Sequence, residues 1–150
     1  MELDPKVLKK LADYCVKEER CTEQIVQKLF KLKIWEDNHP DYIDRLIDEE
    51  FLDDLRFTHA YVKSKFLLSK WGKVKIRRAL KQKNIPDSFI AEAFKEQIDS
   101  DSYLNLLEEL FDKKKKTLQE EEPMKKKAKL ISFLAQRGFE QELIYNLIED

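Results

Sequence analysis

The sequence repeats one apolar pattern three times, and this feature constrains the fold more than any other. The three segments are Leu29–Ile34, Leu80–Ile85 and Leu134–Phe139, and in each an apolar residue lies five positions after the first leucine. The leucines are 51 and 54 residues apart, which gives a unit of roughly 50 residues. A period of this size is typical of stacked helical repeats, in which neighbouring units bury each other's apolar faces.

A pair of apolar residues at helical spacing follows each segment. The pairs are Ile43 with Ile47, Ile90 with Phe94, and Ile144 with Ile148. The first member of the pair comes five residues after the segment in the second and third copies but nine residues after it in the first. The sequence therefore predicts a four-residue insertion around Glu36 to Pro40.

Residues that interrupt helices are scarce. The 150 residues include only two glycines and four prolines, too few for the frequent turns of a β-sandwich or for a glycine-rich phosphate loop. Asn84 and Gly138 are the fifth residues of their segments, at a position where a left-handed backbone is expected to terminate a helix, and Lys33 occupies the same position in the first copy. We predict an all-α fold of three tandem three-helix repeats that form an elongated or curved array, with boundaries at 1–52, 53–100 and 101–150.

Charge is balanced overall but not along the chain. The formal net charge is −1, yet residues 55–86 hold ten basic residues and no acidic one. The other 118 residues then hold 19 basic and 30 acidic groups, a net charge of −11. A contiguous basic block of this kind indicates a surface for a polyanion, either nucleic-acid phosphate or an acidic protein face. The alternative is a solvated lysine-rich face without a partner.

The predicted interface comprises nine of these ten basic residues, all except Arg56, together with one tryptophan. Its residues are Lys63, Lys65, Lys70, Trp71, Lys73, Lys75, Arg77, Arg78, Lys81 and Lys83. On a helical wheel Ile76, Ala79 and Leu80 form the buried face, and Lys73, Arg77 and Lys81 form a stripe beside it, with Arg78 beyond. Like charges at this spacing repel one another, which favours a polyanionic partner.

Three aromatic residues in or beside this block could stack on bases, but helical spacing favours a core role for them. Phe57 and Tyr61 are four residues apart on one predicted helix. For Trp71 the choice between a core role and stacking on bases stays open. Just before Phe57, an aspartate could cap the helix, and Arg56 could pair across the boundary between the first two repeats.

The residues of the second repeat also carry a family resemblance. Phe51–Val62, which contains Asp53-Asp54-Leu55-Arg56-Phe57, and Trp71–Ile85, which opens with Trp-Gly, resemble the signature of the RecX family. Phe133–Phe139, with its Arg-Gly-Phe, is similar to the motif of the family's last repeat. Asn84 departs from the pattern, because RecX proteins usually have glycine there.

The resemblance implies a function. RecX proteins are regulators of the bacterial RecA recombinase, so it implies a non-enzymatic negative regulator that binds the groove of the RecA–single-stranded DNA filament. Such a regulator would suppress ATP hydrolysis and strand exchange, by blocking filament growth or by promoting disassembly. The alternatives are a general DNA-binding helical-repeat protein that acts on single-stranded or duplex DNA without RecA, and a scaffold for another acidic protein.

Other classes of protein find little support in the sequence. No spacing of acids, His or Ser selects a catalytic group, and His59 is expected to pack or face solvent, so we expect no enzyme and no cofactor. Cys15 and Cys21 lie six residues apart and do not match a zinc pattern with His39 and His59, so no metal site is expected; both are expected as reduced thiols, with Cys15 in the core. Apolar runs are short and the N-terminus is acidic, which favours a cytoplasmic protein with no membrane partner, expected as a monomer.

Overall fold

The computed structural model describes residues 2–149, and within that range the chain is entirely helical apart from short connections. The first three helices are α1 (Pro5–Lys17), α2 (Thr22–Lys31) and α3 (His39–Asp48), with the 3₁₀ turn η1 (Glu36–Asn38) before α3. The next three are α4 (Asp54–Leu67), α5 (Lys73–Gln82) and α6 (Asp87–Gln97), and the last three are α7 (Ser100–Thr117), α8 (Pro123–Gln136) and α9 (Gln141–Glu149).

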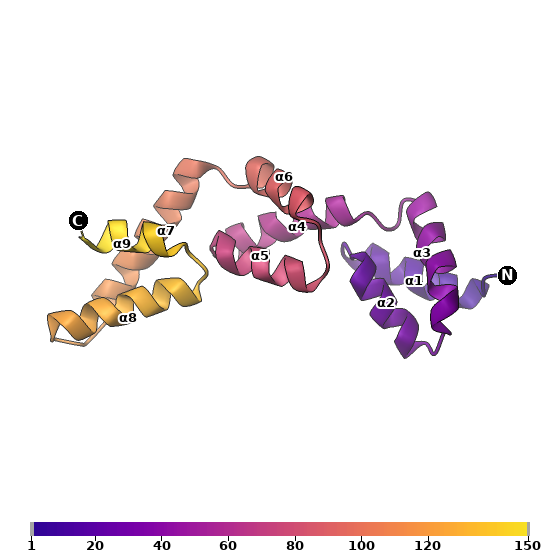
Figure 1. The fold of residues 1–150 in the computed structure, drawn as a ribbon, viewed down its shortest axis with the longest axis horizontal. Helices are drawn as coiled ribbons and strands as arrows, with labels where there is room; N and C mark the ends of the chain where they lie inside the picture. Colours follow the sequence, from indigo (N-terminus) through magenta and orange to yellow (C-terminus); the bar gives the residue numbers. More distant parts are fainter. Residues whose placement is uncertain (1, 150) are drawn as a thin grey trace.

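Figure 1 shows these helices as three groups along one long axis, with the N-terminus at one end and the C-terminus at the other. We call the groups repeat 1 (α1–α3), repeat 2 (α4–α6) and repeat 3 (α7–α9). The predicted fold class, an elongated all-α array of three-helix repeats, is confirmed. The residue boundaries between the repeats stay a prediction. Among the described residues, no helix has the length and apolar character needed to span a bilayer.

Several helix ends follow directly from local sequence. Asp53 caps α4, because its Oδ1 accepts a hydrogen bond from the Arg56 backbone N–H at 3.0 Å. Lys33, Asn84 and Gly138 all have positive φ, of 59°, 60° and 97°, so all three copies use the predicted left-handed position. Its occupants differ, and in repeat 1 a lysine accepts a conformation that glycine or asparagine adopts more easily.

The register of the third helix in repeat 1 differs from the prediction. The buried residues of α3 are His39, Tyr42 and Leu46, whereas Ile47 is exposed and Ile43 is only half-buried. Tyr42 is the fourth residue of α3, as Ile90 is of α6 and Ile144 of α9. The insertion in repeat 1 is therefore three residues rather than four, which matches the three residues of η1.

The buried side chains form two separate clusters. One belongs to repeat 1 alone and is built around Leu11, Ile25 and Leu29, with Cys15 inside it as predicted. The other runs through repeats 2 and 3 and includes Leu80 and Leu134. Cys21 is the one residue of repeat 1 in this second cluster, and both cysteines are free thiols. Repeats 2 and 3 thus share a continuous core, and repeat 1 has its own.

Side chains join repeat 1 to repeat 2. The backbone N–H of Thr22, at the start of α2, donates to the Asp54 carboxylate of α4 at 2.7 Å. Arg56 pairs with Glu19, as predicted for this boundary, and Asn84 Nδ2 donates to Glu23 Oε2 at 2.9 Å.

Backbone contacts join repeat 2 to repeat 3. Gly72 N–H donates to the Arg137 carbonyl at 2.8 Å, and Val74 N–H donates to the Gly138 carbonyl at 2.9 Å. A Cβ on Gly72 would lie 2.4 Å from the carbonyl carbon of Gly138, so only glycine fits. The chain has two glycines, and both are used at this one contact.

Candidate partner and nucleic-acid interface

Helix α5 carries half of the predicted interface residues, and its placement follows from its apolar side chains. Ile76 and Leu80 are fully buried, and Ala79 is half-buried. This fixes which face of α5 packs against the rest of repeat 2. The basic residues between these positions are left on the remaining faces of the helix.

One face of α5 is open to solvent. Val74, Arg77, Arg78, Lys81 and Gln82 line a shallow depression of about 510 Å³ on it. Their spacing of three and four residues places them on one side of the helix. We call this set the α5 face.

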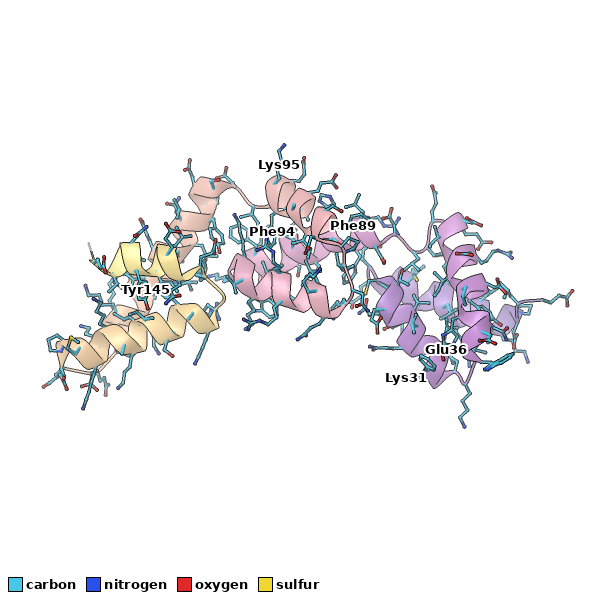
Figure 2. The ribbon with its side chains drawn as sticks, viewed as in Figure 1. Lys31, Glu36, Phe89, Phe94, Lys95 and Tyr145 are labelled. Atoms are coloured by element: carbon cyan, nitrogen blue, oxygen red, sulfur yellow. The ribbon has the colours of Figure 1, made fainter. Side chains whose placement is uncertain are left out.

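The repulsion expected on α5 is partly relieved. Lys81 Nζ lies 3.0 Å from the Asp87 carboxylate, the first acid after the basic block. The guanidinium of Arg77 lies 5.3 Å from the ring centre of Phe94, which points from α6 toward α5 (Figure 2). The stripe therefore carries less uncompensated repulsion than the sequence suggested.

Lys73 lies at the contact with repeat 3 rather than in the depression on α5. Its backbone N–H donates to the Tyr103 hydroxyl at 2.8 Å, and its Nζ lies 4.7 Å from the centre of the Tyr103 ring. The same hydroxyl donates to Glu140 of repeat 3. Burial and the hydrogen bond to Glu140 raise the pKa of Tyr103 well above its ordinary value, so the hydroxyl keeps its proton.

A second group of predicted residues gathers around two aromatic rings. The ammonium of Lys65 lies 5.4 Å from the centre of the Tyr61 ring and 4.7 Å from that of Trp71. Lys75 Nζ lies 4.4 Å from the Trp71 ring, and Lys83 Nζ lies 6.0 Å from the Tyr61 ring. We call these five residues the cation–aromatic row.

The last two predicted residues stand apart from both groups. Lys63 is exposed on α4, and Lys70 is half-buried in the connection to α5 with a φ of 58°. All ten predicted residues belong to repeat 2, but they do not form one surface. They are divided among the α5 face, the cation–aromatic row, the contact with repeat 3 and these two separate positions. Their role in binding stays a prediction.

The sequence-based interpretation of the aromatic residues needs refinement. Phe57 is buried, as predicted, but Tyr61 and Trp71 are only half-buried and lie under lysine ammonium groups. Tyr61 is absent from the predicted interface. The four-residue spacing from Tyr61 to Lys65 on one helix was the available indication of this contact.

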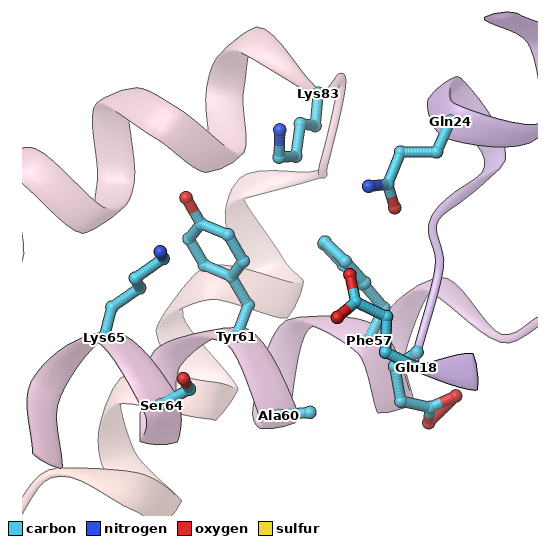
Figure 3. A pocket seen from close by; sticks show the side chains of 9 residues that line it. Glu18, Gln24, Phe57, Ala60, Tyr61, Ser64, Lys65 and Lys83 are labelled. Atoms are coloured by element: carbon cyan, nitrogen blue, oxygen red, sulfur yellow. The ribbon is translucent and has the colours of Figure 1, made fainter. Parts of the chain in front are cut away.

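A pocket of about 440 Å³ opens at one end of the cation–aromatic row, between repeats 1 and 2. Figure 3 shows Tyr61 and Lys65 rising from α4 and Lys83 entering from the end of α5, while Gln24 and Glu18 come from repeat 1. Burial raises the pKa of the Tyr61 hydroxyl, which therefore remains a hydrogen-bond donor at neutral pH.

The two histidines are engaged by other groups. His59 Nε2 lies 2.9 Å from a Glu92 carboxylate oxygen, and His39 Nε2 lies 2.9 Å from the Ile34 carbonyl oxygen. Within residues 2–149, no three His, Cys, Asp or Glu side chains gather closely enough to hold a metal ion.

Comparison with known proteins assigns the chain to a family. Residues 53–93 match the model of the second three-helix domain of RecX, and residues 101–148 match that of the third. Together these matches cover more than half of the 150 residues. The chain belongs to the RecX family.

Individual relatives agree with this assignment. The regulatory protein RecX of Chlorobaculum tepidum is 34% identical over 105 residues, covering 70% of this chain and 62% of the relative. That of Prosthecochloris aestuarii is 27% identical over 145 residues, covering 97% and 93%. A crystal structure of a regulatory protein RecX has the same fold, with a TM-score of 0.86 at 23% identity over all of this chain and 81% of that one.

Several curated relatives are longer than this chain. It spans 43% of the Leuconostoc mesenteroides protein, 53% of the Clostridium acetobutylicum protein and 48% of the Bacillus mycoides protein. These relatives are also named regulatory protein RecX. Repeat 1 lies outside both matched domain models.

Proposed function

We propose that this protein is a non-enzymatic negative regulator of the RecA recombinase that binds the RecA–single-stranded DNA filament. Family membership carries the proposal. The matched second domain also contains the whole basic block of the chain, which supplies a surface for a polyanionic partner. In this proposal the protein lies in the filament groove and suppresses ATP hydrolysis and strand exchange, by blocking filament growth or promoting disassembly.

The shape of the molecule supports this function. The three repeats extend along one axis, so the chain can follow a groove across more than one recombinase subunit (Figure 1). Repeats 2 and 3 share a core and are joined by backbone hydrogen bonds, which makes this part of the array stiff. A stiff ligand loses less conformational entropy on binding than a flexible one.

The α5 face is the part of the basic block that we assign to the filament. Arg77, Arg78 and Lys81 are exposed there, and an exposed helix face can meet acidic side chains or phosphates without rearrangement of the core. Arginine pairs with carboxylates and phosphates through two parallel hydrogen bonds, whereas lysine acts as a point charge. Lys73 is excluded from this assignment because it contacts repeat 3.

The test is the ATPase rate of the cognate RecA on single-stranded DNA, titrated with this protein at moderate salt. We expect inhibition at well below one protein per recombinase subunit. The variant Arg77→Ala/Arg78→Ala/Lys81→Ala should weaken inhibition by about tenfold or more, because each lost ionic contact costs roughly 0.5–1 kcal/mol.

A matched control removes the same charge elsewhere. Lys115→Ala/Lys116→Ala/Lys127→Ala takes three exposed lysines from repeat 3 and should leave inhibition near wild type. Equal losses of ATPase inhibition in the two variants would show that inhibition depends only on the net charge of the protein. No effect of the wild-type protein on RecA, with direct binding to DNA, would instead support a general DNA-binding protein.

A further inference from the structure

The cation–aromatic row alternates charged groups and rings in space, although its members are scattered in sequence. In order they are Lys83, Tyr61, Lys65, Trp71 and Lys75, with each ammonium 4.4–6.0 Å from the neighbouring ring centre. The row starts at the pocket between repeats 1 and 2 and ends at Lys75, whose Cβ lies against Gly138 of repeat 3. It therefore crosses the length of repeat 2.

The two rings are held by the fold yet remain accessible. Tyr61 packs against the buried Phe57, with the ring centres 5.6 Å apart, and also lines the pocket. Trp71 is fixed through its backbone N–H, which donates to the Lys65 carbonyl at 2.9 Å. Both side chains are half-buried, so neither is fully used by the core.

The ammonium groups of the row take part in no described ion pair, although Glu18 and Glu19 line the same pocket as Lys65 and Lys83. The described ion pairs of repeat 2 involve Arg56, His59 and Lys81, and none involves Lys65, Lys75 or Lys83. The described contacts of these three ammonium groups are those with the two rings. A ligand with both phosphates and flat rings can therefore satisfy both partners of each contact. Its phosphate can pair with the ammonium group, and its flat ring can stack on the aromatic side chain.

Single-stranded nucleic acid has this chemistry. Each nucleotide offers one phosphate for an ammonium group and one base whose face can stack on an aromatic ring. Base stacking on a side chain is stronger than an exposed contact between lysine and a ring, so a base can displace the ammonium while the phosphate retains it.

The pocket supplies a place for one unstacked base. Its volume of about 440 Å³ is within the range of small-ligand sites. Lys65 and Lys83 stand with Tyr61 on its repeat 2 side, and Glu18 and Gln24 stand on its repeat 1 side (Figure 3). This distribution of charge directs a phosphate toward the lysines and the polar edge of a base toward Glu18 and Gln24.

We propose that the cation–aromatic row is a direct binding site for single-stranded DNA, in which one base enters the pocket against Tyr61 and another stacks on Trp71. The site acts without RecA and shares no residue with the α5 face, which it adjoins at Lys75. It therefore goes beyond the regulatory function proposed above.

The test uses tryptophan fluorescence of the whole protein with no RecA present. The chain has two tryptophans, and Trp35 lies in repeat 1, is exposed and is not part of the row. Trp35→Phe leaves Trp71 as the only reporter. We expect an oligothymidylate of about eight nucleotides to quench this fluorescence, with an affinity that falls as salt rises.

Variants separate stacking from simple charge attraction. Tyr61→Leu keeps an apolar side chain against Phe57 but removes the ring, and should weaken oligonucleotide binding by about fivefold or more. Lys65→Ala should weaken binding more than Lys63→Ala, which removes the same charge from an exposed position on the same helix. Circular dichroism melting checks that each variant is folded.

An abasic oligonucleotide of the same length keeps the phosphates and removes the bases. We expect it to bind more weakly and to leave Trp71 fluorescence unchanged. Equal affinity for the abasic strand, or binding of the thymidylate without quenching of Trp71, would overturn the proposal. Because RecA is absent, failure of this site leaves the proposed regulatory function standing, and loss of RecA inhibition leaves this site standing.

Discussion

The two contacts between repeats are built at equivalent places but from different groups. In both, the connection between the first two helices of one repeat meets the next repeat, with Cys21 capping α2 where Gly72 caps α5. The first N–H of the second helix is also satisfied in both by a side chain of the next repeat, Asp54 in one case and Tyr103 in the other.

The difference lies in how closely the chains approach. Between repeats 1 and 2 a cysteine side chain and an asparagine occupy the two positions, and ionic groups complete the contact. Between repeats 2 and 3 the same positions are glycines, and the backbones form two hydrogen bonds directly. The contact between repeats 1 and 2 is thus partly ionic, and salt can weaken it. The contact between repeats 2 and 3 has the same geometry but is closely packed, and salt should hardly affect it.

The largest effect should come from the leucine that begins each repeated segment. Leu29→Ala and Leu80→Ala each remove a fully buried side chain and should cost about 2–5 kcal/mol of unfolding free energy. Because Leu29 belongs to the cluster of repeat 1 and Leu80 to the shared cluster, hydrogen exchange should accelerate in repeat 1 alone for the first variant and in repeats 2 and 3 for the second. Equal acceleration along the whole chain in both variants would show that the two cores unfold as one.

The close contact between repeats 2 and 3 should be sensitive to a single methyl group. Gly72→Ala would place a Cβ 2.4 Å from backbone atoms of Gly138, and backbone cannot move aside as a flexible side chain can. We expect a loss of roughly 3 kcal/mol in urea unfolding, at the upper end of overpacking effects. Lys33→Gly is the control, because this exposed residue holds the equivalent left-handed position in repeat 1, and it should change stability little, since glycine adopts its φ of 59° readily. A wild-type midpoint for Gly72→Ala would contradict this packing.

Alkaline pH should also weaken the contact between repeats 2 and 3. The pKa of Tyr103 is raised above its ordinary value of 10.0, first by burial and then by the hydrogen bond to Glu140. A raised pKa means that the folded state favours the protonated form, so this stabilisation is complete below pH 10 and is lost as the pH rises further.

Tyr103→Phe tests this dependence. It should cost about 1–2 kcal/mol at neutral pH, because the Lys73 N–H loses its acceptor. The difference from wild type should then shrink above pH 10 in thermal melts. Burial also raises the pKa of Cys15, Cys21 and Tyr61, so both proteins will lose stability in base. A constant difference between them at all pH values would exclude a role for Tyr103 ionisation.

Much of the architecture was predictable because the apolar residues of each repeat are spaced like those of a helix. Sequence could not choose the register of α3, since Ile43 with Ile47 and Tyr42 with Leu46 are both apolar pairs four residues apart. The packing against α1 and α2 decides between them, with Tyr42 held in place by a 2.9 Å hydrogen bond from the Asp4 N–H to its hydroxyl.

The location of the basic block could be predicted, but its division could not. The charge pattern identifies repeat 2, whereas the partners of Lys73 and Lys81 depend on contacts with Tyr103 and Asp87. Tyr103 is 30 residues from Lys73 in the chain, so no local pattern relates the two. A helical wheel shows the faces of one helix but not the neighbours that cover them.

The smallest effect should come from the ion pair between repeats 1 and 2. Arg56→Ala removes the pair with Glu19 and should cost about 0.5–1 kcal/mol at low salt, because both side chains are partly exposed. The loss should fade in 1 M salt, where charges are screened beyond about 3 Å. Arg45→Ala is the control, since it breaks an ion pair with Glu49 at the C-terminal end of α3 that does not reach repeat 2.

The thiol of Cys21 gives this prediction a local readout. Cys21 is fully buried in the core that repeat 2 provides, and burial raises its pKa, so its reaction with a thiol reagent at neutral pH requires opening of the contact. Arg56→Ala should speed labelling of Cys21 at low salt more than labelling of Cys15, which the core of repeat 1 protects. If the two thiols accelerate equally, Arg56 stabilises repeat 1 itself rather than its attachment to repeat 2.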